Sequence, residues 1–251
     1  MSTSFADHFR SVSGHYAASR PGYPEALFDW LAAQCPAHEL AWDCGCGSGQ
    51  ASAALARHFR QVVATDASAA QIAQASPHAG VEYRVAPAEA SGLAAASVDL
   101  LVVAQALHWF DLARFHEEAR RVLRLQGVIA VWSYGVIGLD DPALDAPVRH
   151  FYREVVGPYW PPERRHVENG YRDLPFPFDP IAAPAFAMRA EWPLDQLLGY
   201  LRSWSATARY IEARGEDPVE ALAATLRPTW GDPATPRGIA WPLALRVGRR
   251  D

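Results

Sequence analysis

The chain has 251 residues, of which 50% are hydrophobic and 20% charged, a composition that predicts a folded globular protein and excludes a disordered one. Its net charge of −5 comes from 23 basic and 28 acidic residues that are scattered along the chain. A nucleic-acid backbone requires a basic face, so we expect no nucleic-acid partner.

Neither the start of the chain nor its apolar runs indicate export or membrane insertion. Residues 1–7 lack the pattern of a signal peptide, and the apolar run 100–110 is too short to span a bilayer. Cys35, Cys44 and Cys46 are odd in number and lack zinc-finger spacing, so we expect reduced thiols and no metal site. These features predict a cytoplasmic protein without a membrane partner, and they assign no oligomeric state.

Short apolar runs alternate with helical patterns in the first half of the chain. Strands are expected at residues 40–44, 62–65, 81–85, 98–104 and 128–132. Helices are expected at 51–59, at 69–75 after the N-cap Ser68, and from Leu112 after the N-cap Asp111. This alternation predicts an α/β fold with a doubly wound, Rossmann-like and mostly parallel sheet.

The pattern changes after Gly135. Residues 136–185 are rich in proline and aromatic residues and predict a long irregular segment, such as a lid. A strand at 186–192, helices at 194–204 and 218–226 and a final strand at 239–247 are expected after it. We predict that a C-terminal antiparallel strand completes the sheet.

A glycine-rich turn joins the first strand to the first helix of this core. Asp43 ends the strand, and Gly45, Gly47 and Gly49 follow at alternate positions, which lets a ligand approach the backbone closely. Asp66 ends the second strand, 17 residues after Gly49, where a carboxylate can accept hydrogen bonds from both hydroxyls of a ribose. Together they predict a nucleoside site, although a tight turn without a ligand stays an alternative.

The glycine spacing argues against a dinucleotide. In a G-x-G-x-x-G fingerprint the third glycine would fall on Gln50 or Ser52, so the pattern fails in both registers. The pattern that fits is D-x-G-x-G-x-G, which resembles motif I of the class I S-adenosylmethionine-dependent methyltransferases. An NAD-dependent oxidoreductase therefore stays only a minor alternative.

Other segments resemble the trans-aconitate methyltransferase-like group of small-molecule methyltransferases. They are Y-x-x-x-R-P-x-Y-P at 16–24, the segment 86–89, in which Pro87 replaces a common acid, and 105–110 after the fourth strand. The resemblance implies S-adenosyl-L-methionine as cofactor and these cofactor-binding residues: Tyr16, Arg20, Asp43, Gly45, Cys46, Gly47, Gly49, Asp66, Ala67, Ala88, Glu89 and Gln105. It also implies one domain, made of a cofactor-covering segment 1–36, a core 37–135, a lid 136–185 and a completing part 186–251.

The substrate side of the site is expected at the carboxyl ends of the strands and in the lid. His108 is the candidate catalytic residue, and the candidate substrate-binding residues are Trp109, Tyr134, Trp160, Arg164 and Tyr171. A carboxylate acceptor is ionised at neutral pH and needs no base, whereas a hydroxyl or an amine could use His108. Arginines gather in the lid, so we favour a small carboxylate or another oxygen nucleophile, with a non-catalytic or regulatory cofactor-binding subunit as the alternative.

Overall fold

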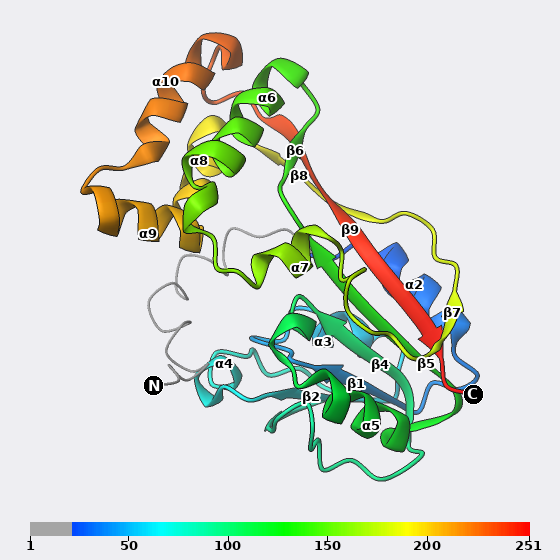
Figure 1. The fold of residues 1–251 in the computed structure, drawn as a ribbon. Coiled ribbons are helices and arrows are strands. Elements are labelled where there is room, and N and C mark those ends of the chain that lie inside the picture. The colour runs from blue at the N-terminus through cyan, green and yellow to red at the C-terminus, as the bar shows by residue number, and fades with distance from the viewer. Residues whose placement is uncertain (1–21) are drawn as a thin grey trace. The chain divides into compact units, whose positions relative to one another are not determined.

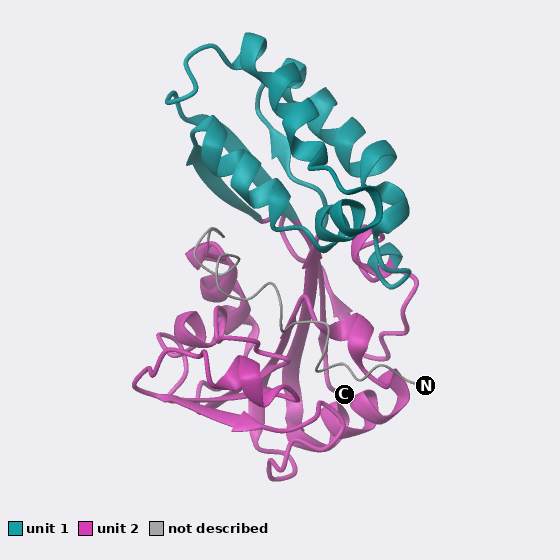
Figure 2. Cartoon of the chain, turned by 90° about the vertical axis from the view of Figure 1, so that its left-hand side faces the viewer, with its two compact units in different colours: residues 1–21, 135–165, 187–242 teal, residues 22–134, 166–186, 243–251 magenta. Residues whose placement is uncertain are grey.

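The computed structural model describes residues 22–251. The predictions for Tyr16 and Arg20 lie outside the described residues. The chain forms two compact units, and the described part of unit 1 is 135–165 and 187–242. Unit 2 contains 22–134, 166–186 and 243–251 (Figure 2). The two units therefore divide the predicted lid at residue 166, and its treatment as one element of a single domain stays a prediction.

Unit 2 is built on a sheet in the order β3-β2-β1-β4-β5-β9 (Figure 1). Its strands are β1 Leu40–Cys44, β2 Gln61–Asp66, β3 Val81–Val85, β4 Val98–Ala104, β5 Leu123–Tyr134 and β9 Arg237–Arg249. The first five pair in parallel, whereas β9 runs antiparallel to β5, as does β7 (Asp179–Ile181) to β9. The predicted Rossmann-like sheet with a C-terminal antiparallel strand is confirmed.

Helices cover both faces of this sheet. They are α2 Glu25–Gln34, α3 Ser52–Leu55, α4 Ala69–Ile72, the 3-10 helix η2 Leu107–Trp109 and α5 Leu112–Val122. Along β4, Leu101 and Val103 pack in one core cluster with α5, while Leu100 and Val102 pack in the other with α2. Burial on both faces explains why this strand is almost continuously apolar.

Several boundaries differ from the predicted ones. The helix predicted at 51–59 is only the short α3, and turns lead from it to β2. The final strand is longer than 239–247, and its residues 237–242 belong to unit 1 and 243–249 to unit 2. The predicted caps are confirmed, since Ser68 accepts the N–H of Gln71 and Asp111 accepts that of Arg114.

The prediction that 136–185 is irregular is wrong. This segment contains β6 Gly138–Leu139, α6 Pro142–His150, the π-helix η3 Phe151–Val155, the 3-10 helix η4 Gly157–Tyr159, α7 Arg164–Glu168 and β7. The helix α6 forms because Asp141 caps it through the N–H of Ala143, and because Leu144 and Val148 bury one face at i,i+4 spacing. Proline at the first helical position, Pro142, favours this start although the sequence makes the segment look like a loop.

The rest of unit 1 combines a small antiparallel sheet with helices. The strands β6 and β8 (Ala187–Trp192) pair with the first half of β9. The helices of this part are α8 Leu194–Arg202, α9 Ser205–Arg214 and α10 Pro218–Trp230. Within the described part of the chain, no helix is both long enough and apolar enough to cross a membrane.

Candidate functional site

The three glycines of the loop after β1 differ in the space around them. All three glycines have positive φ, 71° at Gly45, 56° at Gly47 and 88° at Gly49. A Cβ on Gly45 would lie 2.6 Å from that of Ala106, and one on Gly49 would overlap the hydroxyl of Tyr83. Among the described residues, the nearest atom to such a Cβ at Gly47 would be 3.8 Å away. Within the part of the chain that the structure describes, Gly47 is therefore the glycine of the loop whose backbone has most room beside it for a ligand.

Asp66 at the end of β2 holds this loop in place. Its Oδ2 accepts the N–H of Gly47 at 2.9 Å, and its Oδ1 accepts the N–H of Ser68 at 2.8 Å. Burial raises the pKa of Asp66, and these two hydrogen bonds oppose that rise. Each carboxylate oxygen keeps a second lone pair, so the group can also accept hydrogen bonds from a ribose. Ala67, the next residue, is exposed.

Asp43 is a second acid beneath the loop. It is fully buried, and its Oδ2 accepts the hydroxyl of Ser52 at 2.6 Å. Among the described residues its Oδ1 has no hydrogen-bond partner. Burial raises the pKa of Asp43 to about 7. The hydrogen bond from Ser52 lowers this pKa, and the charge of Asp66 raises it further. A positively charged ligand nearby would favour the ionised form of both acids.

The segment after β3 lies beside Asp66. The N–H of Ala86 donates to the backbone oxygen of Asp66 at 3.1 Å, and Ala88 is buried in the core. Glu89 accepts the N–H of Asp111 at 2.9 Å and so supports the start of α5. This contact gives Glu89 a structural role that the sequence did not indicate, and its predicted contact with a cofactor stays a prediction.

The turn after β4 brings together the predicted residues of the second half of the site. Gln105 has a φ of 59°, and its N–H and its side-chain amide donate at 2.9 Å to the backbone oxygens of Trp132 and Tyr134. In η2, which follows, Nδ1 of His108 lies 3.0 Å from the hydroxyl of Tyr171, and the rings of His108 and Trp109 are 4.8 Å apart. Unit 2 therefore gathers these side chains at the carboxyl ends of β4 and β5.

Comparison with known proteins identifies the family. A methyltransferase of Dictyostelium discoideum is 36% identical over 228 residues, which cover 89% of this chain and 86% of that protein. The chain belongs to the class I S-adenosylmethionine-dependent methyltransferases. The model of the methyltransferase domain family matches residues 42–131, from β1 to β5.

Other proteins that this methyltransferase resembles are also described as methyltransferases. A solved structure from Anaeromyxobacter dehalogenans, described as a type II methyltransferase, is 50% identical, has a TM-score of 0.88 and covers 92% of this chain and 97% of its own. An S-adenosylmethionine-dependent methyltransferase of Saccharomyces cerevisiae is 25% identical over 77% of this chain and 78% of that protein. An Anabaena variabilis methyltransferase, 18% identical with a TM-score of 0.53, shares the fold.

The residues of the loop suit the methyl donor of this family. S-adenosylmethionine carries ribose hydroxyls, which match the acceptor oxygens of Asp66, and a positively charged sulfonium, which matches a buried acidic environment. The described residues leave space for it beside the backbone of Gly47. Among the described residues no cluster of three or more His, Cys, Asp or Glu side chains is arranged to bind a metal ion.

In unit 1 of the methyltransferase, Arg164 lies on an aromatic surface. Its guanidinium carbon is 4.6 Å from the ring centre of Trp160 and 5.7 Å from that of Tyr152, whose hydroxyl accepts the Nε hydrogen at 2.9 Å. Trp204 packs against both rings. Sequence reasoning missed Tyr152 and Trp204, although the π-helix that carries Tyr152 is a feature often found at functional sites.

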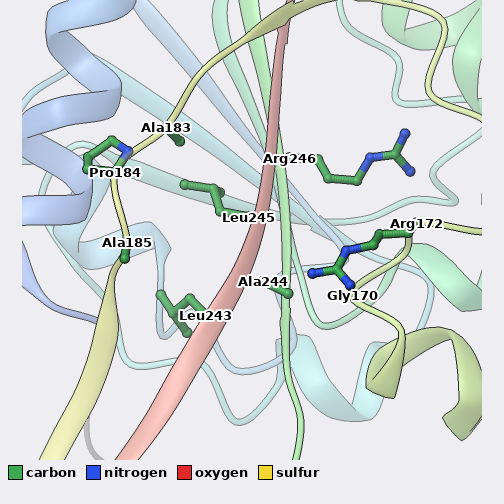
Figure 3. A pocket seen from close by; sticks show the side chains of 9 residues that line it. All are labelled: Gly170, Arg172, Ala183, Pro184, Ala185, Leu243, Ala244, Leu245 and Arg246. Atoms are coloured by element: carbon green, nitrogen blue, oxygen red, sulfur yellow. The ribbon is translucent and has the colours of Figure 1, made fainter.

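A pocket of about 300 Å³ opens at the outer edge of β9 (Figure 3). Leu243 and Leu245 lie on one side of the strand and Arg172 and Arg246 on the other. Arg246 donates to the backbone oxygens of Tyr171 and Leu174, so its guanidinium is already engaged. Since β4 and β5 lie between β1 and β9, this pocket is separate from the glycine loop of the methyltransferase.

Proposed function

We propose that this methyltransferase methylates a small-molecule oxygen nucleophile, with a carboxylate as the favoured acceptor. The observation that supports a carboxylate most is Arg164, a guanidinium held by Trp160 and Tyr152 that forms no ion pair with any described acid. A guanidinium with fixed orientation is well suited to bind the two oxygens of a carboxylate. Arg164 is thus proposed to recognise the acceptor, together with Trp160.

The cofactor is proposed to bind along the loop and strand ends of unit 2. When bound, S-adenosylmethionine supplies a methyl group that is already activated by the positive charge on sulfur. Asp66 accepts the ribose hydroxyls, and the backbone of Gly47 lies against the methionyl part. The other predicted residues in the described part of the chain complete the proposed contact surface, namely Asp43, Gly45, Cys46, Gly49, Ala67, Ala88, Glu89 and Gln105.

For a carboxylate acceptor, the residues of the chain mainly have to bind and orient. The acceptor oxygen is ionised at neutral pH, so no side chain has to remove a proton. Positioning and the exclusion of water then account for most of the catalysis. His108, Trp109 and Tyr134 are proposed to border the acceptor in this way, with His108 as a hydrogen-bond donor.

Within the family, we propose membership of the trans-aconitate methyltransferase-like group. The segments 16–24 and 105–110 support it, because both carry residue patterns that resemble that group. Two other functions predict different binding properties. A non-catalytic subunit would bind the cofactor without turnover, and an NAD-dependent oxidoreductase would bind NAD at least as tightly as S-adenosylmethionine.

Calorimetry and turnover together test this proposal. We expect binding of S-adenosylmethionine and S-adenosylhomocysteine, much weaker binding of NAD, and release of S-adenosylhomocysteine with some members of a panel of small carboxylic acids. Arg164→Gln should raise the KM for the acid at least tenfold. The exposed Arg153 of the same unit provides the matched control Arg153→Gln, which should not. Turnover with phenols or amines but no acid would contradict the carboxylate assignment.

A further inference from the structure

Tyr171 is a buried residue with an unusual backbone conformation. Its exposed fraction is 0%, and its φ of 59° lies in the left-handed region, which a bulky side chain rarely adopts. Its ring stacks on that of His108, with centroids 5.8 Å apart and planes 30° apart, and its hydroxyl lies 3.0 Å from Nδ1. The structure thus places a strained, buried phenol directly against the candidate catalytic imidazole.

Neighbouring residues hold this strained conformation from both sides of the peptide. Arg246 on β9 donates to the backbone oxygen of Tyr171 and, at 2.8 Å, to that of Leu174. The N–H of Tyr171 donates to the backbone oxygen of His166 at 2.8 Å. Gly170 also has positive φ, and a Cβ there would lie 2.6 Å from that of Ala244. Such support is needed because an unsupported left-handed tyrosine would relax.

We propose that Tyr171 is a positioning residue that donates its hydroxyl hydrogen to Nδ1 of His108, so that His108 presents an Nε2–H donor to the acceptor carboxylate. The inference rests on the proposed function, in which the acceptor is an anion that needs a donor and not a base. It replaces the predicted direct contact between Tyr171 and substrate by an indirect role through His108.

The direction of this hydrogen bond decides what His108 can do. In neutral imidazole one ring nitrogen carries the hydrogen and the other accepts, and the partner of one nitrogen fixes the state of the other. When Tyr171 donates to Nδ1, Nε2 carries the hydrogen and His108 can bind an anionic oxygen. In the opposite direction Nε2 would hold a lone pair, as a base for a hydroxyl acceptor requires.

Nitrogen NMR of the imidazole tests the inference without any acceptor. We expect the ¹⁵N chemical shifts of His108, assigned by comparison with His108→Asn, to show the Nε2–H tautomer. Tyr171→Phe keeps the stacked ring and removes the hydroxyl, so it should shift the population towards Nδ1–H. Tyr200→Phe is the matched control, since its buried hydroxyl accepts from Trp241 at 3.0 Å and lies in unit 1. A dominant Nδ1–H tautomer in the unsubstituted protein, or the same tautomer ratio in Tyr171→Phe, would overturn the proposal.

Kinetics provide a second readout with an acid that the protein methylates. Tyr171→Phe should raise the KM for this acid about tenfold, as a lost hydrogen bond to a charged group does. In a His108→Asn background the same change should have no further effect, because the two residues act as one unit. Additive effects in this double-mutant cycle would assign Tyr171 a merely structural role.

Arg246→Gln tests whether the hydrogen bond from Arg246 to the backbone of Tyr171 matters for binding of the acid. It is also the substitute experiment if Tyr171→Phe does not fold. We expect a smaller rise in KM, which disappears when Tyr171 or His108 is also substituted, and an unchanged KM would contradict the role of Arg246. If no acid is methylated at all, the proposed function fails, whereas the tautomer measurement still decides the direction of the hydrogen bond.

Discussion

The carboxylate of Asp66 accepts the backbone N–H of Gly47 at 2.9 Å, so the acid that ends β2 directly holds the middle glycine of the loop. The same loop is tied to β2 through Gly45 and Cys46, whose N–H groups donate to the backbone oxygen of Thr65 at 2.8 and 3.0 Å. The candidate ribose acceptor therefore also shapes the loop on which the cofactor is proposed to lie. A substitution of Asp66 should therefore affect both the proposed ribose contact and the shape of the loop.

Substitution of Asp66 should weaken cofactor binding. Asp66→Ala removes a charged acceptor, whose hydrogen bonds are worth about 1.5–3 kcal/mol. We expect the Kd for S-adenosylmethionine to rise roughly ten- to a hundredfold, measured by calorimetry. An unchanged Kd would show that the ribose lies elsewhere.

A matched control separates this effect from a general loss of stability. Asp99 is also buried and accepts two backbone N–H groups, those of Glu39 and Leu40, but it lies at the opposite end of the parallel strands. Asp99→Ala should lower the melting temperature, because it also frees Arg124 from its ion pair, and leave the Kd unchanged.

Gly49 offers a test of the loop itself. Gly49→Ala would strain the backbone at a φ of 88° and place a Cβ against the hydroxyl of Tyr83, so the loop must shift. We expect the affinity for the cofactor to fall at least tenfold. Gly92→Ala is the control, because Gly92 has a similar φ of 72° but no atom of the described residues would lie within 4 Å of such a Cβ. Equal affinities for the two variants would show that the loop does not touch the cofactor.

The parts of the fold that the sequence predicted are those with a local physical signal. The run 98–104 is apolar because β4 is buried on both faces, and Ser68 and Asp111 are at helix N-termini because their side chains satisfy exposed N–H groups. The glycine loop was predictable for the same reason, since its conformation excludes side chains at Gly45 and Gly49.

The missed parts depend on contacts between distant residues. His108 and Tyr171 are 63 residues apart, and nothing in either segment predicts that the two side chains meet. The helix α9 was not predicted because only Ala206 and Thr207 are buried along it, which leaves no apolar stripe. The segment around α6 was predicted as irregular because its prolines hid a helix start.

Asp43 should make stability depend on pH. Its folded-state pKa of about 7 lies above the ordinary value of 3.8, so between these pH values the folded protein keeps a proton that the unfolded chain has lost. The free energy of unfolding contributed by this group is therefore greatest below pH 4 and falls as the pH rises to about 7. Asp43→Asn cannot ionise, so its stability relative to the unsubstituted protein should rise over this range by up to about 4 kcal/mol.

Urea unfolding at pH 4.5 and pH 8 measures this difference, and any pH-independent cost of asparagine cancels in the comparison. Ser52→Ala provides a second variant, because the hydroxyl of Ser52 opposes the rise in the pKa of Asp43. Without this hydroxyl the pKa of Asp43 should be higher, so the free energy of unfolding should continue to fall up to a higher pH. A constant difference between Asp43→Asn and the unsubstituted protein would mean that Asp43 is ionised throughout.

His116 on α5 should act in the opposite direction. Burial lowers its pKa, helped by the charges of Arg120 and Arg246, and its Nε2 has no hydrogen-bond partner among the described residues. As the pH falls below 6.5, this histidine therefore becomes protonated in the unfolded chain before it does in the folded protein. The free energy of unfolding falls over that pH range. His116→Phe should fit beside the ring of Phe178 and raise the free energy of unfolding by about 1–3 kcal/mol, more at pH 5.5 than at pH 8. A destabilised variant in urea unfolding would contradict this.

The last prediction concerns His108. With a carboxylate acceptor, His108→Asn should raise the KM for the acid, leave the Kd for S-adenosylmethionine unchanged and alter kcat little. The rate should vary little between pH 6 and 8, because the acceptor, with a pKa of about 4, stays ionised. With a hydroxyl or phenol acceptor, the same change should lower kcat about a hundredfold or more, and the rate should fall as the imidazole becomes protonated. Steady-state kinetics across this pH range distinguish the two. If His108→Asn changes neither kcat nor KM for the true substrate, His108 does not line the site, and its contact with Tyr171 serves only the packing of unit 2.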